Sequence, residues 1–148
     1  MTTTTQRIDV QQAAPEIYRA MLRLDTEVGK SSLEARLQDL LKFRVAQMNG
    51  CAYCMDMHGR DAVAGGERPE RLYTVAGWRE AGARFDERER AALAFVEEMT
   101  RIADHGVSDD VYDAAAEHFS EADLAALIFL GMTINAWTRL GVAAKLTP

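Results

Sequence analysis

The sequence has very little cysteine: two residues among 148, Cys51 and Cys54, three positions apart. A small secreted scaffold would carry more cysteines, spaced so that disulfides close its loops. The first residues, 1–6, are polar and lack the apolar core of a secretion signal. We therefore expect a frayed N-terminal tail, no signal peptide and a cytoplasmic protein. In that reducing compartment a Cys-x-x-Cys pair is more often catalytic or metal-binding than structural.

Clustered positive charge is also missing, since 17 Lys and Arg residues face 23 Asp and Glu residues and the formal net charge is -6. Nucleic acids and anionic membrane surfaces attract clustered Lys and Arg, so we predict neither as a partner. The longest apolar stretch, residues 124–144, is interrupted by four polar residues: Thr133, Asn135, Thr138 and Arg139. This pattern favours a buried core or interface helix over a membrane span.

Strand patterns are absent as well, because no period-two alternation runs for any length, whereas apolar residues recur at helical spacing. We predict an all-α fold: one domain of about seven helices over residues 15–148, behind a flexible tail of residues 1–14. The predicted helices cover residues 15–29, 31–49, 51–65, 69–78, 86–105, 108–119 and 120–148. Asn49-Gly50 is a strong break, and Asp86 with Glu89 forms a capping-box pattern.

The segment that carries chemistry begins at this break, with Cys51, Cys54 and His58. At about 100° per residue, the three side chains share an arc of roughly 60° on one helix face. Cys51 would lie in the first turn, where free N–H groups and the helix dipole stabilise a thiolate, the reactive form of cysteine. A second thiol can resolve a sulfenic acid into a disulfide, and a histidine can hold or move the proton.

Two other interpretations of these residues stay open. The cysteines can be small apolar core residues, with His58 as a hydrogen-bonded core histidine. Alternatively, the three side chains can bind zinc, with a fourth ligand from Asp39 or His105. Structural zinc sites usually draw their ligands from two separated pairs, and the sequence has no second pair. We therefore predict no metal site.

The motif and its surroundings resemble a known family. Cys-x-x-Cys-x-x-x-His in a helical chain of this length resembles the alkylhydroperoxidase D (AhpD)-like group of the carboxymuconolactone decarboxylase superfamily. The resemblance extends over residues 15 to 145, with agreement in order in four blocks: residues 40–58, 72–80, 85–94 and 134–140.

The resemblance implies an AhpD-like helical bundle that assembles into a homo-trimer or homo-hexamer. It also implies a thiol-dependent peroxidase, an antioxidant enzyme that reduces a small hydroperoxide and binds no cofactor. In alkylhydroperoxidase D itself, a lipoyl group on a partner protein reduces the cysteines again, so we expect an external dithiol or lipoyl-type reductant and a reductant protein as partner. Members without the cysteine pair, such as the true decarboxylases, do different chemistry, and Cys51 and Cys54 therefore argue against decarboxylation.

The resemblance also assigns roles to four residues. Cys54 matches the cysteine that attacks the peroxide, and Cys51 matches the resolving cysteine. The helix dipole at the start of the helix would instead favour Cys51 as the more acidic thiol. His58 matches the motif histidine. Asp39 stands where the family has a glutamate and is one methylene shorter, so a proton relay through it needs a water. The alternative to an enzyme is a non-enzymatic redox sensor or a zinc-stabilised oligomeric scaffold.

Overall fold

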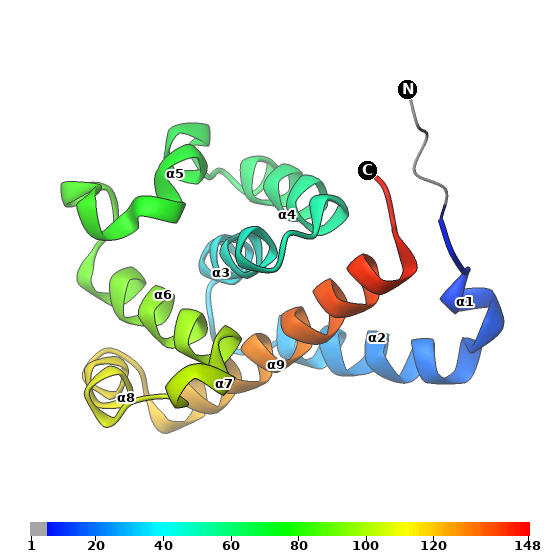
Figure 1. Cartoon of the computed structure of the whole chain (residues 1–148). Helices are drawn as coiled ribbons and strands as arrows, with labels where there is room; N and C mark the ends of the chain where they lie inside the picture. Colours follow the sequence, from blue (N-terminus) through cyan, green and yellow to red (C-terminus); the bar gives the residue numbers. More distant parts are fainter. Residues whose placement is uncertain (1–5) are drawn as a thin grey trace.

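The computed structural model describes residues 6–148, and this part of the chain is helical without strands (Figure 1). The helices are α1 (Val10–Ala13), α2 (Pro15–Gly29), α3 (Ala35–Asn49), α4 (Ala52–Ala64), α5 (Pro69–Thr74), η1 (Val75–Glu80), η2 (Gly82–Arg84), α6 (Glu87–Thr100), α7 (Ile102–His105), α8 (Asp109–Ala116) and α9 (Glu121–Ala144). The η elements are 3₁₀ helices. The predicted all-α fold is confirmed.

The described residues contain more helices than the seven predicted, for local reasons. The predicted helix 86–105 divides at Arg101, whose φ of -98° and ψ of 32° end α6 before the short α7 begins. The chain after α5 continues as 3₁₀ helices. The tail predicted for residues 1–14 includes a turn of helix, α1, capped by Asp9; residues 1–5 of that tail lie outside the described part. The Asp86–Glu89 capping box forms as predicted.

Helix α3 is the centre of the bundle, and α4, α6 and α9 pack around it (Figure 1). Its apolar face is almost inaccessible to solvent, with Leu40, Leu41 and Val45 all 0% exposed. Burial of such side chains stabilises the fold by about 1.5–3 kcal/mol each. The Asn49-Gly50 turn joins α3 directly to α4, so the candidate cysteines follow directly from the buried central helix.

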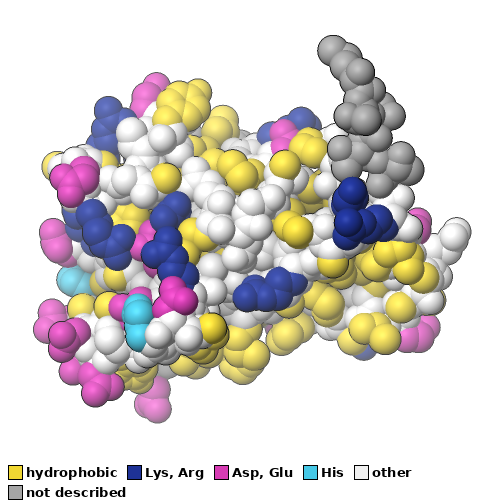
Figure 2. All heavy atoms as spheres, viewed as in Figure 1, with side chains coloured by type: hydrophobic (Ala, Val, Ile, Leu, Met, Phe, Trp, Pro, Cys, Tyr) yellow, Lys and Arg dark blue, Asp and Glu magenta, His cyan; other side chains and the backbone are white. Residues whose placement is uncertain are grey.

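Helix α9 is long and apolar enough to cross a membrane by length and composition. In this fold it packs against α2, α3 and α6, and Leu127, Leu130 and Ile134 belong to the core. This agrees with the prediction that residues 124–144 form a core or interface helix. The rest of its apolar surface stays uncovered: α9 and α2 leave apolar side chains exposed, visible along the lower rim of the face in Figure 2.

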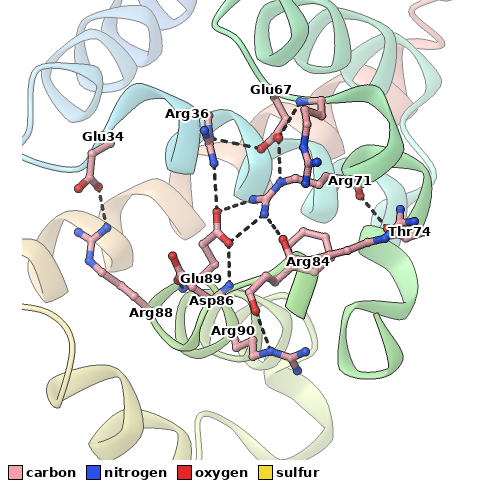
Figure 3. Close-up of polar contacts among 12 residues, drawn as sticks. Glu34, Arg36, Glu67, Arg71, Thr74, Arg84, Asp86, Arg88, Glu89 and Arg90 are labelled. Atoms are coloured by element: carbon pink, nitrogen blue, oxygen red, sulfur yellow. Dashed lines mark hydrogen bonds and ion pairs between the residues drawn. The ribbon is translucent and has the colours of Figure 1, made fainter. Parts of the chain in front are cut away.

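A cluster of buried charges fixes the segment that follows α4 (Figure 3). The Arg71 guanidinium lies between the carboxylates of Glu67, at 2.8 Å, and Glu89, and it also donates to the carbonyl oxygen of Arg84. Arg36 of α3 approaches both glutamates, at 3.6 and 3.9 Å. Buried charges are tolerated when they are paired in this way. The cluster therefore holds α5 and the 3₁₀ segment against α3 and α6.

The two ends of the described chain meet. The backbone N–H of Arg7 donates to the carbonyl oxygen of Ala144 at 2.8 Å, and the Arg7 guanidinium donates to that of Ala143 at 3.2 Å. These carbonyls lie in the last turn of α9, where a helix has no partners of its own for them. The N-terminal segment is thereby held beside the end of α9.

Candidate functional site

The site begins at the reversal between α3 and α4. Gly50 adopts φ 65° and ψ 29°, the left-handed conformation that glycine reaches without the usual steric cost. The N–H of Cys51 returns to the carbonyl oxygen of Ala46 at 3.1 Å and closes the end of α3. The break predicted at Asn49-Gly50 is confirmed, and it places the cysteine pair against the core.

Cys51 is the N-cap of α4, one position before the helical turn in which we predicted it. Its Sγ accepts a hydrogen bond from the backbone N–H of Cys54 at 3.3 Å, as an N-cap side chain does. The two residues form a disulfide with a Cα–Cα distance of 5.3 Å. Both are buried, at 2% and 3% exposure. The pair is thus close enough to cycle between dithiol and disulfide.

Helix α9 closes one side of the pair. A Cβ atom on Gly141 would lie 2.8 Å from the Sγ of Cys51 and 3.4 Å from that of Cys54. The amide of Asn49 donates to Asn135 Oδ1 and to Thr138 Oγ1, both at 2.9 Å, and so ties the turn to the same helix. The sulfur atoms therefore lie directly against the backbone of α9.

A cavity of about 220 Å³ opens on the other side of Cys54. Its wall is mostly apolar and comes from α2, α4, α9 and the segment after α9: Tyr18, Leu22, Asp25, Tyr53, Cys54, Met57, His58, Trp137, Leu140 and Leu146. Cys54 and His58, one helical turn apart, both line it, whereas Cys51 does not. Of the two cysteines, a small apolar molecule in this cavity would therefore meet Cys54.

His58 is a buried imidazole at 8% exposure. Burial and, to a smaller extent, the nearby Lys42 ammonium lower the pKa of His58 from 6.5 to about 4, against the opposing charges of Asp61 and Asp25. The imidazole is therefore neutral at pH 7 and free to accept a proton. Its Nδ1 is buried and finds no hydrogen-bond partner among the described residues.

Asp39 does not join the other three candidates. Burial raises the pKa of Asp39, with Lys42 acting in the opposite direction. One oxygen of its carboxylate lies 3.9 Å from where a Cβ on Gly65 would stand, beside the C-terminal end of α4. Residues 54 and 65 are separated along α4 by roughly 16 Å, from the helical rise per residue. The structure thus places Cys51, Cys54 and His58 together and leaves Asp39 outside the cavity.

A different carboxylate, which the sequence analysis missed, does line the cavity. Asp25 comes from α2, and its Oδ1 lies 3.9 Å from the Nζ of Lys42. A single Asp in an amphipathic helix far from the motif looks like a solvated surface residue. No local pattern marks Asp25, because only the packing of α2 against the bundle brings it to Cys54 and His58.

The zinc interpretation required a fourth ligand beside the motif. Among residues 6–148, no group of three or more His, Cys, Asp or Glu side chains has a metal-binding arrangement. His105 is an exposed residue of the short helix α7, and Asp39 lies beside Gly65. Neither of the two residues considered as a fourth ligand thus lies in the cavity with Cys54 and His58.

Comparison with known proteins gives a consistent result. The family model of the carboxymuconolactone decarboxylase family matches residues 15–98. The chain is 35% identical to the uncharacterised protein YdfG of Bacillus subtilis over 139 residues, or 94% of each chain. A crystal structure from Agrobacterium tumefaciens, of a protein of unknown function named as a candidate antioxidant defence protein AhpD, superposes with a TM-score of 0.93 at 33% identity over 97% of both chains.

A more distant structure shows the same fold. It is a peroxidase-related, uncharacterised protein from Ralstonia eutropha, described as an alkylhydroperoxidase AhpD core. The TM-score is 0.81 at 20% identity, and the match covers 94% of this chain and 74% of that one. At this level of identity the likeness concerns the fold alone.

Proposed function

This chain belongs to the carboxymuconolactone decarboxylase family and has the AhpD-like fold, and from that premise we propose that it is a thiol-dependent peroxidase. Its Cys51 and Cys54 would cycle between the dithiol and the disulfide while the enzyme reduces a small hydroperoxide. One observation carries the proposal: Cys54 and His58 line the same apolar cavity, and Cys51 is bonded to Cys54 from outside that cavity. The cavity thus holds an attacking thiol, Cys54, beside a proton acceptor, His58, and the resolving thiol of Cys51 lies behind Cys54.

The reaction starts from the reduced pair. The thiol of Cys54 gives its proton to neutral His58, and the thiolate attacks the terminal oxygen of the hydroperoxide. The O–O bond breaks, Cys54 becomes a sulfenic acid, and the leaving alkoxide takes the proton from His58 to form an alcohol. Cys51 then attacks the sulfenic sulfur, which releases water and forms the disulfide. The peroxide is reduced by two electrons that the two thiols supply.

The cycle needs a reductant to restore the thiols. Since the cavity is small, at about 220 Å³, and both cysteines are buried, we propose a small dithiol, such as a lipoyl-type group presented by a partner protein. The dithiol is oxidised to its disulfide as Cys51 and Cys54 become thiols. The chain itself would hold no cofactor and no metal. Asp39 of α3, whose carboxylate lies beside Gly65, would act on protons only through water.

We place this enzyme in the cytoplasm, without a nucleic-acid or membrane partner. We also propose a homo-trimer or homo-hexamer. The apolar side chains that α2 and α9 leave exposed support this assembly, since patches of this kind commonly mark protein interfaces. Ile17 of α2 is 70% exposed, and Phe129 and Met132 of α9 are 47% and 50% exposed.

The test is intact mass spectrometry of the reduced, metal-free protein before and after one equivalent of cumene hydroperoxide. The wild type should lose the mass of two hydrogens. Cys51→Ser should gain one oxygen and form an adduct with dimedone, because the sulfenic acid on Cys54 has no resolving thiol. Cys54→Ser should stay reduced under the same conditions.

Turnover separates an enzyme from its alternatives. With dihydrolipoamide in excess, a peroxidase consumes many equivalents of hydroperoxide, whereas a redox sensor consumes one. If both thiols remain titratable after treatment with peroxide, the peroxidase proposal fails. Stoichiometric zinc in the purified protein would instead support the scaffold.

A further inference from the structure

The cavity contains a charge arrangement that the roles of Cys54 and His58 do not use. Asp25 of α2 lines it beside both residues. Lys42 of α3 lies behind, with only 12% of its side chain exposed, and its Nζ is 3.9 Å from the Asp25 carboxylate. Two opposite charges from two further helices thus face the imidazole.

We propose that Asp25, held by Lys42, is the positioning carboxylate for proton transfer between Cys54 and His58, in the role that the family resemblance assigns to Asp39. The inference rests on the proposed function, because it concerns the proton that leaves the attacking thiol. Asp25 would act through His58 and need not touch the hydroperoxide.

The physical reason is the charge that appears on His58. When the Cys54 thiol loses its proton to the imidazole, an imidazolium forms in a mostly apolar wall. A carboxylate nearby stabilises that cation, and an ammonium destabilises it. Burial has the largest effect on how strongly His58 holds this proton, and Asp25 and Lys42 act on it with opposite sign.

The other groups around His58 leave this role to Asp25. From α4 itself, Asp61 raises the pKa of His58 more than Asp25 does, but its side chain is exposed to solvent and does not line the cavity that holds Cys54. Helix α9 and the residues after it contribute only apolar or aromatic side chains to the cavity wall: Trp137, Leu140 and Leu146. Asp39 does not line the cavity and lies near the far end of α4.

The first experiment measures the pKa of His58 by NMR titration of its ring protons in the oxidised protein, where no thiol titrates. The chain has three histidines, so His58→Gln assigns the signal. Asp25→Asn should lower the pKa of His58, Lys42→Met should raise it, and the double variant should lie between them. Glu27→Gln, which removes an exposed carboxylate of α2 paired with Lys30 at 2.8 Å, should leave it unchanged.

The second experiment measures the rate constant for sulfenic acid formation with cumene hydroperoxide at pH 7, in the Cys51→Ser background. Asp25→Asn should slow it by about threefold to tenfold, as expected for a loss of half to one pKa unit in proton affinity. Adding Lys42→Met should recover part of the rate. Circular dichroism of each variant checks that the helices are intact.

Several results would overturn the inference. A charge effect is contradicted if Asp25→Asn and Lys42→Met shift the His58 pKa in the same direction, or if neither variant shifts it. The role belongs to Asp39 if Asp39→Asn slows sulfenic acid formation while Asp25→Asn does not. Failure of the proposed function gives a different result. Neither the Cys51→Ser protein nor any variant made in it would then form a sulfenic acid, while the shifts in the His58 pKa seen by NMR would remain.

Discussion

Replacing Gly141 by alanine tests how closely α9 packs on the sulfur atoms. The new Cβ would lie 2.8 Å from the Sγ of Cys51 and 3.4 Å from the Sγ of Cys54. The first distance is too short for a carbon and a sulfur in contact. Neither sulfur can swing away, because both are fixed by their disulfide and lie at the start of α4. The helices α4 and α9 must therefore separate locally.

The magnitude follows from two opposing terms. Forcing one extra methyl group into a packed core typically costs about 1–3 kcal/mol. Alanine is a better helix former than glycine, by about 1 kcal/mol in a helix interior. Gly141→Ala should therefore lower the free energy of unfolding by up to about 2 kcal/mol, despite the gain in helix propensity.

Urea denaturation of the oxidised protein, followed by circular dichroism, measures this change. Gly29→Ala is the matched control, since Gly29 ends α2 and a Cβ there meets no atom within 4 Å. That variant should be as stable as the wild type or more stable. If Gly141→Ala is instead more stable than the wild type by about 1 kcal/mol, as helix propensity alone predicts, the sulfur pair does not lie against α9 as described and the reasoning fails.

Three further predictions concern other parts of the molecule. The pKa of His58 is near 6.5 in the unfolded chain and about 4 in the folded chain. The free energy of unfolding should therefore fall by about 3 kcal/mol as the pH drops from above 6.5 to 4. His58→Phe should lose this part of the pH dependence in urea titrations. Arg71→Met leaves Glu67, with a side chain only 1% exposed, without its closest partner, and should cost about 3–5 kcal/mol in the same assay, unlike the exposed Arg60→Met. Asp86→Ala removes the cap of α6 and should cost about 1 kcal/mol, which Asp86→Ser should largely restore.

The sequence predicts those parts of the site that depend on local chemistry. Asn49-Gly50 ends one helix because glycine readily adopts a positive φ, and the next helix then carries Cys51, Cys54 and His58 on one face at fixed spacing. These relations hold whatever surrounds the helix. For the same reason the helical fold and the cap of α6 could be predicted in advance.

The environment of the motif depends on how separate helices pack, and the sequence alone does not specify it. Asp39 has the spacing of the family glutamate, yet the packing of α3 against α4 leaves its carboxylate beside Gly65. Asp25 has no motif at all, yet α2 brings it into the cavity. The division at Arg101 was missed because a single non-helical residue leaves the apolar periodicity on both sides intact.

The contact of Arg7 with the last turn of α9 has a practical consequence for handling the protein. Leu146, two residues beyond Ala144, lines the cavity, so both ends of the described chain lie close to its rim. An affinity tag fused after Pro148 would begin close to the cavity and slow the exchange of small molecules. A tag inserted at Gly106, between α7 and α8, would stand at a turn that takes no part in the cavity wall and would leave that exchange unaffected.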